Sequence, residues 1–360
     1  MPQTTATGPN LTTMTYLGRQ AVKFGLLFLL VLIVGRALLS AAINYYRAVN
    51  PPPPPPPTVG FGLLPRLVFP ETTAKTVTSY KLETPTGGLP RFGDRAKVFF
   101  MPKSALGLLS DEKVKQIAAE YNFVFTPEVL DSRTYRWRKS QPLETTFQID
   151  AQTYQFAFKT DFLSRPELLS NNRLPQNVDA VNQVKSMLAA AQLLPEDMAT
   201  SAGEAVYLKA LGGELQPAAA YSDADFVQID LNRTPIDNKF RMYTPEGYKG
   251  SVQAIVSGMF DGDDGIVQLE YNYHPVDYTQ METYPLRTVD SAWKILQAGE
   301  GYVASPGDSP TAVVREVDLG YYDSFEEQSY LQPIYVFIGD GGFLGYVPAL
   351  DPRYVQGSNP

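Results

Sequence analysis

The sequence contains no cysteine and only one histidine, His274, among its 360 residues. The lack of cysteine excludes disulfide frameworks, thiolate nucleophiles, zinc ribbons and iron–sulfur clusters. A lone imidazole cannot build a multi-histidine metal site. The net charge of −8 argues against nucleic acid as a partner, because binding to phosphates relies on neutralisation by Lys and Arg. With 44% hydrophobic and 19% charged residues, the composition is nevertheless that of a folded protein.

Acidic residues are absent from the first 50 positions, which carry four basic residues and leave residues 51–360 with a net charge of −12. Residues 24–46 (FGLLFLLVLIVGRALLSAAINYY) form an apolar run long enough to cross a membrane as one helix. Arg19 and Lys23 precede this run, so we predict that residues 1–23 are a cytoplasmic tail. Since no later stretch is as long without charged or glycine breaks, we predict a single span.

The same segment can also be interpreted as a cleaved signal peptide. Residues 24–35 would be its apolar region, and the small residues Ser-Ala-Ala at 40–42 would suit a cleavage site. We favour an uncleaved anchor, because the apolar pattern continues beyond that site. Both interpretations place residues 60–360 outside the cytoplasm, and the anchor predicts a single-pass protein of the bacterial cytoplasmic membrane.

Arg36 places a charge near the middle of the predicted span, where it costs several kcal/mol unless it finds a partner or reaches the headgroups. One interpretation is a contact with an acidic or polar group on another membrane helix. The other is that the side chain extends to the headgroups and thins the bilayer locally. In the second case the helix should tolerate Arg36→Leu.

Residues 47–70 are predicted to form a proline-rich linker and a strap. The seven prolines at 51–57 lack the N–H groups that helices and sheets need, which predicts a polyproline II rod roughly 22 Å long. A spacer is favoured over a docking ligand for a proline-recognition module. Residues 58–70 (TVGFGLLPRLVFP) are apolar and interrupted by prolines, which predicts an extended strap on the folded body. The strap is expected to contact the body through Phe61, Leu64 and Phe69.

The rest of the chain predicts an α+β fold with two antiparallel-sheet units, residues 71–219 and 220–360, each with packed helices. A loop at 212–220 is expected to separate them. Apolar periodicity and capping signals indicate helices at 110–121, 177–193 and 288–298. Alternating or apolar runs indicate strands at 73–84, 95–101, 121–125, 133–139, 143–150, 153–160, 224–233, 250–260, 265–274, 312–322, 332–339 and 341–351.

Two features resemble metal or catalytic sites. The loop FDGDDG at 260–265 carries Asp261, Asp263 and Asp264, but its spacing differs from that of an EF-hand. Asp and Gly are also the residues that a hairpin turn requires, so a turn is predicted. His274 lies at the end of a predicted strand without a nucleophile motif nearby, and we expect it to be a polar surface residue.

Acidic pairs such as Glu326 with Glu327, or Asp223 with Asp225, would suit glycan hydrolysis if a cleft held the two carboxylates at a defined separation. Sequence cannot show such a separation, and any chain with 38 acidic residues contains pairs of this kind. We therefore expect a protein that is not an enzyme, with no catalytic residue, metal or cofactor.

Tyrosine is abundant, with 22 residues, and several occur in close pairs. Its ring supplies contact area while its hydroxyl stays hydrated, which is typical of recognition surfaces. Tyr271, Tyr273, Tyr321 and Tyr322 are therefore candidate interface residues. The alternative is that these side chains stabilise a sheet by cross-strand pairing.

Residues 314–351 (VREVDLGYYDSFEEQSYLQPIYVFIGDGGFLGYVPALD) have a distinctive order of strands. A strand ending in a tyrosine pair, at 319–322, precedes a PIYVF strand at 333–337 and a YVPA strand at 346–349. A tryptophan-containing helix (TVDSAWKILQAGEGY) lies upstream. This part of the chain, about residues 224–351, resembles YycH/YycI-type regulators, which have PepSY-like α+β architecture and a single membrane pass. The resemblance implies regulation of a sensor histidine kinase through membrane-helix and extracytoplasmic contacts.

Together these features predict a membrane-anchored extracytoplasmic protein of the bacterial envelope that regulates other envelope proteins by binding them. Two alternatives remain at this stage, namely a structural or assembly subunit of an envelope complex, and an enzyme acting on envelope glycan.

Overall fold

The computed structural model divides the chain into two compact units, residues 1–56 and 57–360. Within them, the structure describes residues 11–49, 55–71, 77–141, 143–164, 174–258 and 265–357. The first four prolines of the predicted rod lie outside these residues, and so do Asp261, Asp263 and Asp264 of the predicted turn.

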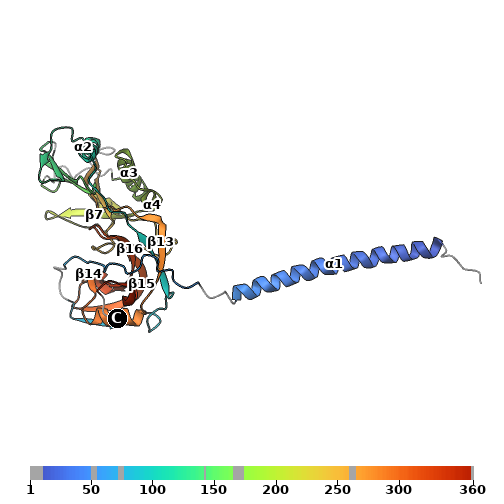
Figure 1. The fold of residues 1–360 in the computed structure, drawn as a ribbon. Helices are drawn as coiled ribbons and strands as arrows, with labels where there is room; N and C mark the ends of the chain where they lie inside the picture. The colour runs from blue at the N-terminus through green and yellow to red at the C-terminus, as the bar shows by residue number, and fades with distance from the viewer. Residues whose placement is uncertain are drawn as a thin grey trace, which may run out of the picture. The chain divides into compact units, whose positions relative to one another are not determined.

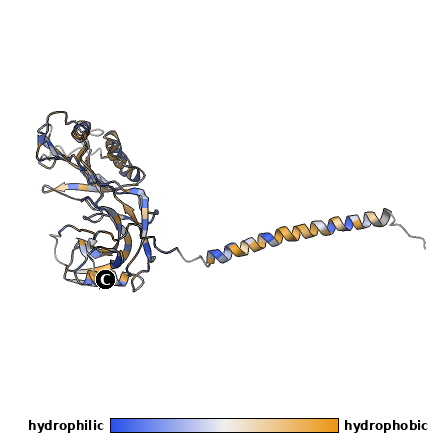
Figure 2. Cartoon of the chain, in the orientation of Figure 1, coloured by the Kyte–Doolittle hydropathy of each residue, from blue (hydrophilic) through white to orange (hydrophobic). Residues whose placement is uncertain are grey.

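The first unit is dominated by one long helix, α1 (Leu11–Val49), of 39 residues. Its stretch from Met14 to Arg47 is long and apolar enough to cross a membrane, and it is the one such helix among the described residues. Figure 2 shows hydrophobic residues along most of this helix. The helix contains the predicted span at 24–46 and extends beyond it at both ends. This agrees with a single membrane pass.

The second unit contains two large sheets. The first has nine strands, all paired antiparallel, in the order β3-β4-β5-β6-β12-β11-β9-β7-β8. Its strands are β3 (Glu128–Val129), β4 (Thr134–Lys139), β5 (Thr145–Asp150), β6 (Phe156–Thr160), β7 (Glu204–Leu211), β8 (Glu214–Pro217), β9 (Phe226–Leu231), β11 (Val252–Ser257) and β12 (Ile266–Tyr271).

The second sheet has eight strands built around the long pair β15 and β16, with β17 and β14 beyond β16. Most pairs are antiparallel, but β1 and β10 each run parallel to β15. Its strands are β1 (Ser79–Leu82), β2 (Arg95–Phe100), β10 (Met242–Tyr243), β13 (Asp277–Pro285), β14 (Tyr302–Ser305), β15 (Thr311–Tyr322), β16 (Tyr330–Gly339) and β17 (Leu344–Pro348).

Helices cover both sheets, which confirms the α+β class (Figure 1). α2 (Ser110–Glu120) and α3 (Asn177–Ala190) bury their apolar stripes in the core of the nine-stranded sheet, and the short α4 (Glu196–Ala199) follows α3. α5 (Val289–Gln297) packs on the eight-stranded sheet. It begins where the Thr288 side chain accepts a hydrogen bond from the Ser291 N–H, a standard N-cap. The three predicted helices are thus confirmed.

The pairing of the strands differs from that expected for two domains that follow one another in sequence and each form their own sheet. β9, β11 and β12 follow residue 220 in sequence, yet they continue the sheet begun by β4, β5 and β6 through the antiparallel β6–β12 pair. Conversely β2, which precedes residue 220, pairs with β13 and β16 of the other sheet. The predicted boundary between 219 and 220 therefore lies inside the nine-stranded sheet, because these hydrogen-bonded pairs join segments distant in sequence.

Two local predictions were wrong. Residues 121–125 form the C-terminal cap of α2 and the turn after it rather than a strand, because Asn122 takes a left-handed conformation and Phe123 donates its N–H to the Ala118 carbonyl, as in a Schellman motif. The predicted loop at 212–220 contains β8. Gly212 and Gly213 both have positive φ, which is what a two-residue turn between β7 and β8 requires.

The strap over residues 58–70 lies on the second unit as predicted. Leu64 is fully buried, and its N–H and C=O bond to the carbonyl of Tyr354 and the N–H of Gln356. Phe61 contacts Tyr330 with ring centroids 5.0 Å apart. Phe69 stacks on Tyr302 of β14 at 4.9 Å. All three predicted contact residues therefore pack on the body.

Candidate functional site beside the strap

The tyrosines predicted as interface residues are mostly buried. Tyr271, Tyr321 and Tyr322 are 4%, 2% and 0% exposed, and Tyr273 is partly buried. The hydroxyl of Tyr271 donates to the Leu193 carbonyl. Because their rings pack inside the sheets, these side chains do not form a surface for a partner, and the cross-strand alternative describes them better.

Arg36 is exposed on α1 and has no ion-pair partner among the described residues. The two interpretations of this side chain remain open. We expect Arg36→Leu to leave the amount of protein in the membrane fraction unchanged, since leucine removes the cost of a charge in hydrocarbon. Immunoblotting of membrane and soluble fractions measures this. A shift of the Leu variant to the soluble fraction would contradict the prediction.

A buried ion cluster joins the two sheets. The guanidinium of Arg233, which follows β9, has no exposed surface and bonds to Asp323 after β15 and to Asp197 in α4, at 3.0 and 2.7 Å. It also donates to the His274 carbonyl and lies over the Tyr273 ring. Burial alone would lower the pKa of Arg233, but the carboxylates of Asp323 and Asp197 raise it well above its ordinary value. The cluster therefore sets one buried cation against two carboxylates, each paired with it directly.

His274 belongs to the same region and is only 4% exposed, so the prediction of a surface residue was wrong. Its Nε2 lies 2.9 Å from the amide nitrogen of Gln155 and 3.1 Å from the carbonyl oxygen of Phe325. These partners come from the start of β6 and the segment after β15. A lone polar residue at a strand end is buried here because a second sheet packs over it.

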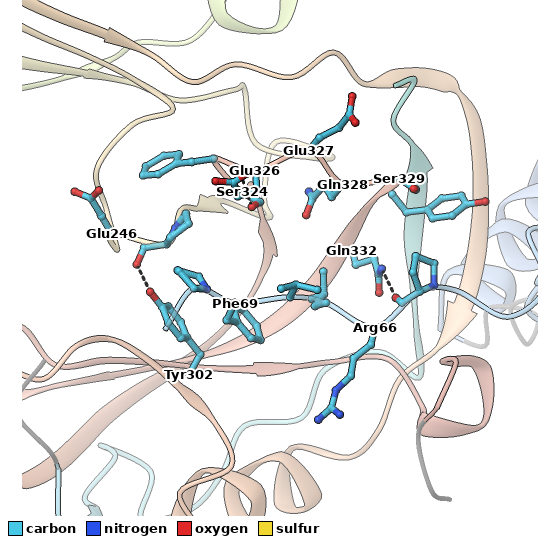
Figure 3. A pocket seen from close by; sticks show the side chains of 17 residues that line it. Arg66, Phe69, Glu246, Tyr302, Ser324, Glu326, Glu327, Gln328, Ser329 and Gln332 are labelled. Atoms are coloured by element: carbon cyan, nitrogen blue, oxygen red, sulfur yellow. Dashed lines mark hydrogen bonds between the residues drawn. The ribbon is translucent and has the colours of Figure 1, made fainter. Parts of the chain in front are cut away.

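A groove beside the strap is the candidate site in the described part of the second unit. Its volume is about 420 Å³, and apolar side chains from the strap face the segment between β15 and β16 (Figure 3). The groove is lined by Pro65, Arg66, Leu67, Val68, Phe69, Pro70, Pro245, Glu246, Tyr302, Ser324, Phe325, Glu326, Glu327, Gln328, Ser329, Tyr330 and Gln332.

Aromatic packing and side-chain hydrogen bonds fix the walls of this groove. The Phe69 ring lies parallel to Tyr302 and edge-on to Tyr322, with centroids 4.9 and 4.7 Å away. The Tyr302 hydroxyl donates to the Pro245 carbonyl at 2.9 Å, and the Gln332 amide donates to the Pro65 carbonyl at 2.9 Å (Figure 3). The groove is therefore preformed, which lowers the ordering cost of binding.

Three glutamates line the groove, namely Glu246, Glu326 and Glu327, and their carboxylates differ in their bonding partners. Glu246 pairs with Lys249 at 3.0 Å, and Glu327 accepts the N–H of Ser104 at 2.8 Å. Glu326 is exposed and has no ion pair or hydrogen bond to its side chain among the described residues. The Glu327 carboxylate is thus bonded to the backbone of another segment, whereas the Glu326 carboxylate is available to a cationic ligand.

The other acidic pair lies apart from the groove. Asp223 ends a short 3₁₀ turn at Tyr221–Asp223, and Asp225 accepts the N–H of Ala210 at 3.0 Å. Among the described residues, no group of three His, Asp or Glu side chains is placed to hold a metal ion.

Sequence reasoning missed the groove, although it predicted the strap. The residues come from four distant segments, so their meeting depends on sheet order. One local signal was present: the apolar residues Leu67, Val68 and Phe69 lie between two prolines, and a proline in a sheet is confined to an edge strand.

Lys249 also links the groove to Glu270 of β12. Glu270 bonds to Lys159 at 2.7 Å and to Lys249 at 2.9 Å. Burial alone would raise the pKa of Glu270, but the hydrogen bonds from Lys159 and Lys249 lower it below its ordinary value of 4.5. A carboxyl with a lowered folded-state pKa stabilises the fold above its unfolded-state pKa, and this stability disappears as the pH falls through the folded-state pKa.

We therefore expect Glu270→Gln to lower the free energy of unfolding by about 1 kcal/mol at pH 7, a modest effect because Lys159 is half exposed and screened by water. At pH 3 the difference between the variant and the wild type should shrink. Urea titration of the full chain in detergent at both pH values measures it. A difference independent of pH would contradict the assignment.

No protein-family model and no curated protein matches the chain. An uncharacterized protein from Eubacterium rectale is 10% identical, with a TM-score of 0.33 over 72% of this chain and 84% of that one. The YpeB C-terminal domain of Bacillus megaterium is 10% identical, with a TM-score of 0.25 over 69% of this chain and 100% of that one. The resemblance to YycH/YycI-type regulators stays a prediction.

Proposed function

We propose that this chain is a membrane-anchored, non-enzymatic protein of the bacterial envelope whose second unit lies outside the cytoplasm and regulates other envelope proteins by binding them. The observation that carries the proposal is the preformed groove beside the strap, which combines apolar walls with an available carboxylate. The strap follows the proline run and the apolar helix directly in sequence, so a partner bound there is held by a segment continuous with the anchor.

The partner we propose is another membrane or envelope protein. A sensor histidine kinase is the specific candidate, because the resemblance to YycH/YycI-type regulators implies one. A structural subunit of an envelope complex would use the same groove but would stay bound through purification. Gentle detergent extraction followed by mass spectrometry separates a regulator from such a subunit.

Photo-crosslinking in native membranes tests the proposal. A photoreactive amino acid replaces Val68, which is 79% exposed in the groove, or Val178, which is 71% exposed on α3 outside it. We expect Val68 to give a reproducible crosslinked envelope protein, and Val178 to give much less of that product. Failure to recover any reproducible protein from either position would count against a binding function.

A further inference from the structure

The strap has an unpaired backbone edge where it borders the groove. Within the described residues, the N–H and C=O groups of Arg66–Phe69 make no hydrogen bond, whereas those of Leu64 are both paired. Residues 63–70 contain no positive φ, and Pro65 and Pro70 hold φ near −65°. Four residues of extended chain thus present free donors and acceptors, which is the property of an edge strand that can pair with another chain.

The side to which the backbone groups of this edge point follows from the contacts of the strap residues. Leu67 is buried and Phe69 is packed on aromatic rings, while Arg66 and Val68 are exposed, so side chains alternate as in a strand. The Pro65 carbonyl accepts from Gln332, a residue of the groove (Figure 3). In an extended chain every second residue directs its N–H and C=O to the same side. The backbone groups of Leu67 and Phe69 therefore face the groove.

We propose that the strap binds an extended peptide segment of the partner as an added β-strand. This inference rests on the proposed function. The peptide pairs with the backbone of Leu67 and Phe69 and places alternate apolar side chains in the groove. The groove also selects the peptide by its charge. Glu326 lacks a cation among the described residues and the body is acidic, so the peptide carries Lys or Arg opposite this carboxylate.

The two prolines that flank this edge limit the pairing. A proline has no N–H and cannot extend a ladder, so the added strand covers four residues. The same reasoning excludes a polyproline segment as the occupant, because it would offer carbonyls to the strap without any donors.

A selection with the full-length chain in lipid nanodiscs tests this proposal. The probe is a library of random hexapeptides displayed on phage. We expect enrichment of sequences with apolar residues at alternate positions and at least one Lys or Arg. Enrichment of proline-rich or acidic sequences, or no enrichment above empty nanodiscs, would overturn the proposal.

Binding measurements on N-methylated versions of the tightest-binding synthetic peptide provide a second test. N-methylation at the alternate residues that face the strap should weaken binding about tenfold, because it removes two hydrogen bonds, whereas methylation at the intervening residues should change it less than about twofold. Hydrogen exchange at the amides of Leu67 and Phe69 should slow on binding, while that at Arg66 and Val68 stays unchanged. Equal effects at both sets of residues would show that no strand is added.

Glu326→Gln is the matched variant for the charge. We expect it to lose the preference for Lys or Arg over Gln in the peptide while the alternating apolar pattern persists. If the preference persists in this variant, the assigned role of Glu326 is wrong. A Val68 crosslink in membranes without slowed exchange at Leu67 and Phe69 would refute strand addition while leaving the binding function intact, whereas no crosslink at all would refute the function itself.

Discussion

Replacing Arg233 by methionine is expected to lower the free energy of unfolding by about 3–5 kcal/mol. The reason is that the guanidinium is fully buried and is the ion-pair partner of two carboxylates, of which Asp323 is itself fully buried. Removing the cation leaves Asp323 and Asp197 close together without a counter-charge. Methionine fills most of the volume, so the expected loss comes from the unpaired charges rather than from a cavity.

Urea unfolding of the full chain in detergent, followed by tryptophan fluorescence, measures this effect. Trp137 lies in the core of the nine-stranded sheet and Trp293 packs against the eight-stranded one, so the signal reports on both. Arg241→Met is the matched control, because Arg241 pairs with Glu204 at the surface, where both side chains are about half exposed and the pair contributes at most about 1 kcal/mol. Equal losses in the two variants would contradict the role assigned to the buried cluster.

Gly250→Ala is expected to destabilise the protein by about 3 kcal/mol through overpacking. A Cβ at this position would lie 2.6 Å from both the N and the O of Leu231 and 2.7 Å from the O of Val252. These are backbone atoms and cannot move aside as a side chain would. The close approach exists because the Gly250 N–H donates to the buried carboxylate of Asp230 at 2.9 Å.

The same urea titration measures the Gly250 variant. Gly88→Ala is its control, since a Cβ there meets nothing within 4 Å and the backbone is not in the left-handed region. We expect the control to change stability by less than about 0.5 kcal/mol. A Gly250 variant as stable as the control would mean that β9 and the start of β11 do not approach each other as described.

Features that depend only on residues close together in the sequence could be predicted from it. The helix at 288–298 was predicted from the helical spacing of Ala292, Trp293, Ile295 and Leu296, and the structure buries Ala292 and Leu296 of this set in α5. The strap was found because prolines exclude helix while its apolar residues need burial. The β7–β8 hairpin was missed although Gly212-Gly213 signals a two-residue turn.

Features that depend on long-range pairing could not be predicted in this way. Nothing in the sequence near Phe156 says that β6 pairs with β12, whose residues lie more than a hundred positions later. The burial of His274 and of Tyr322 follows from that sheet arrangement, and so does the meeting of the strap with Tyr302. A tyrosine pair has the same composition in a core as on a surface, so only the three-dimensional arrangement distinguishes the two.

The sidedness of the chain is the most direct test of an anchored protein with an extracytoplasmic body. Because the sequence has no cysteine, single cysteines can report on it. Ser309→Cys places an exposed thiol on the second unit, and Gln20→Cys places one before the apolar run. In intact spheroplasts, we predict that a membrane-impermeant maleimide labels the variant at 309 at once and the variant at 20 only after lysis. Labelling of position 20 alone, or of neither position until lysis, would contradict the proposed location.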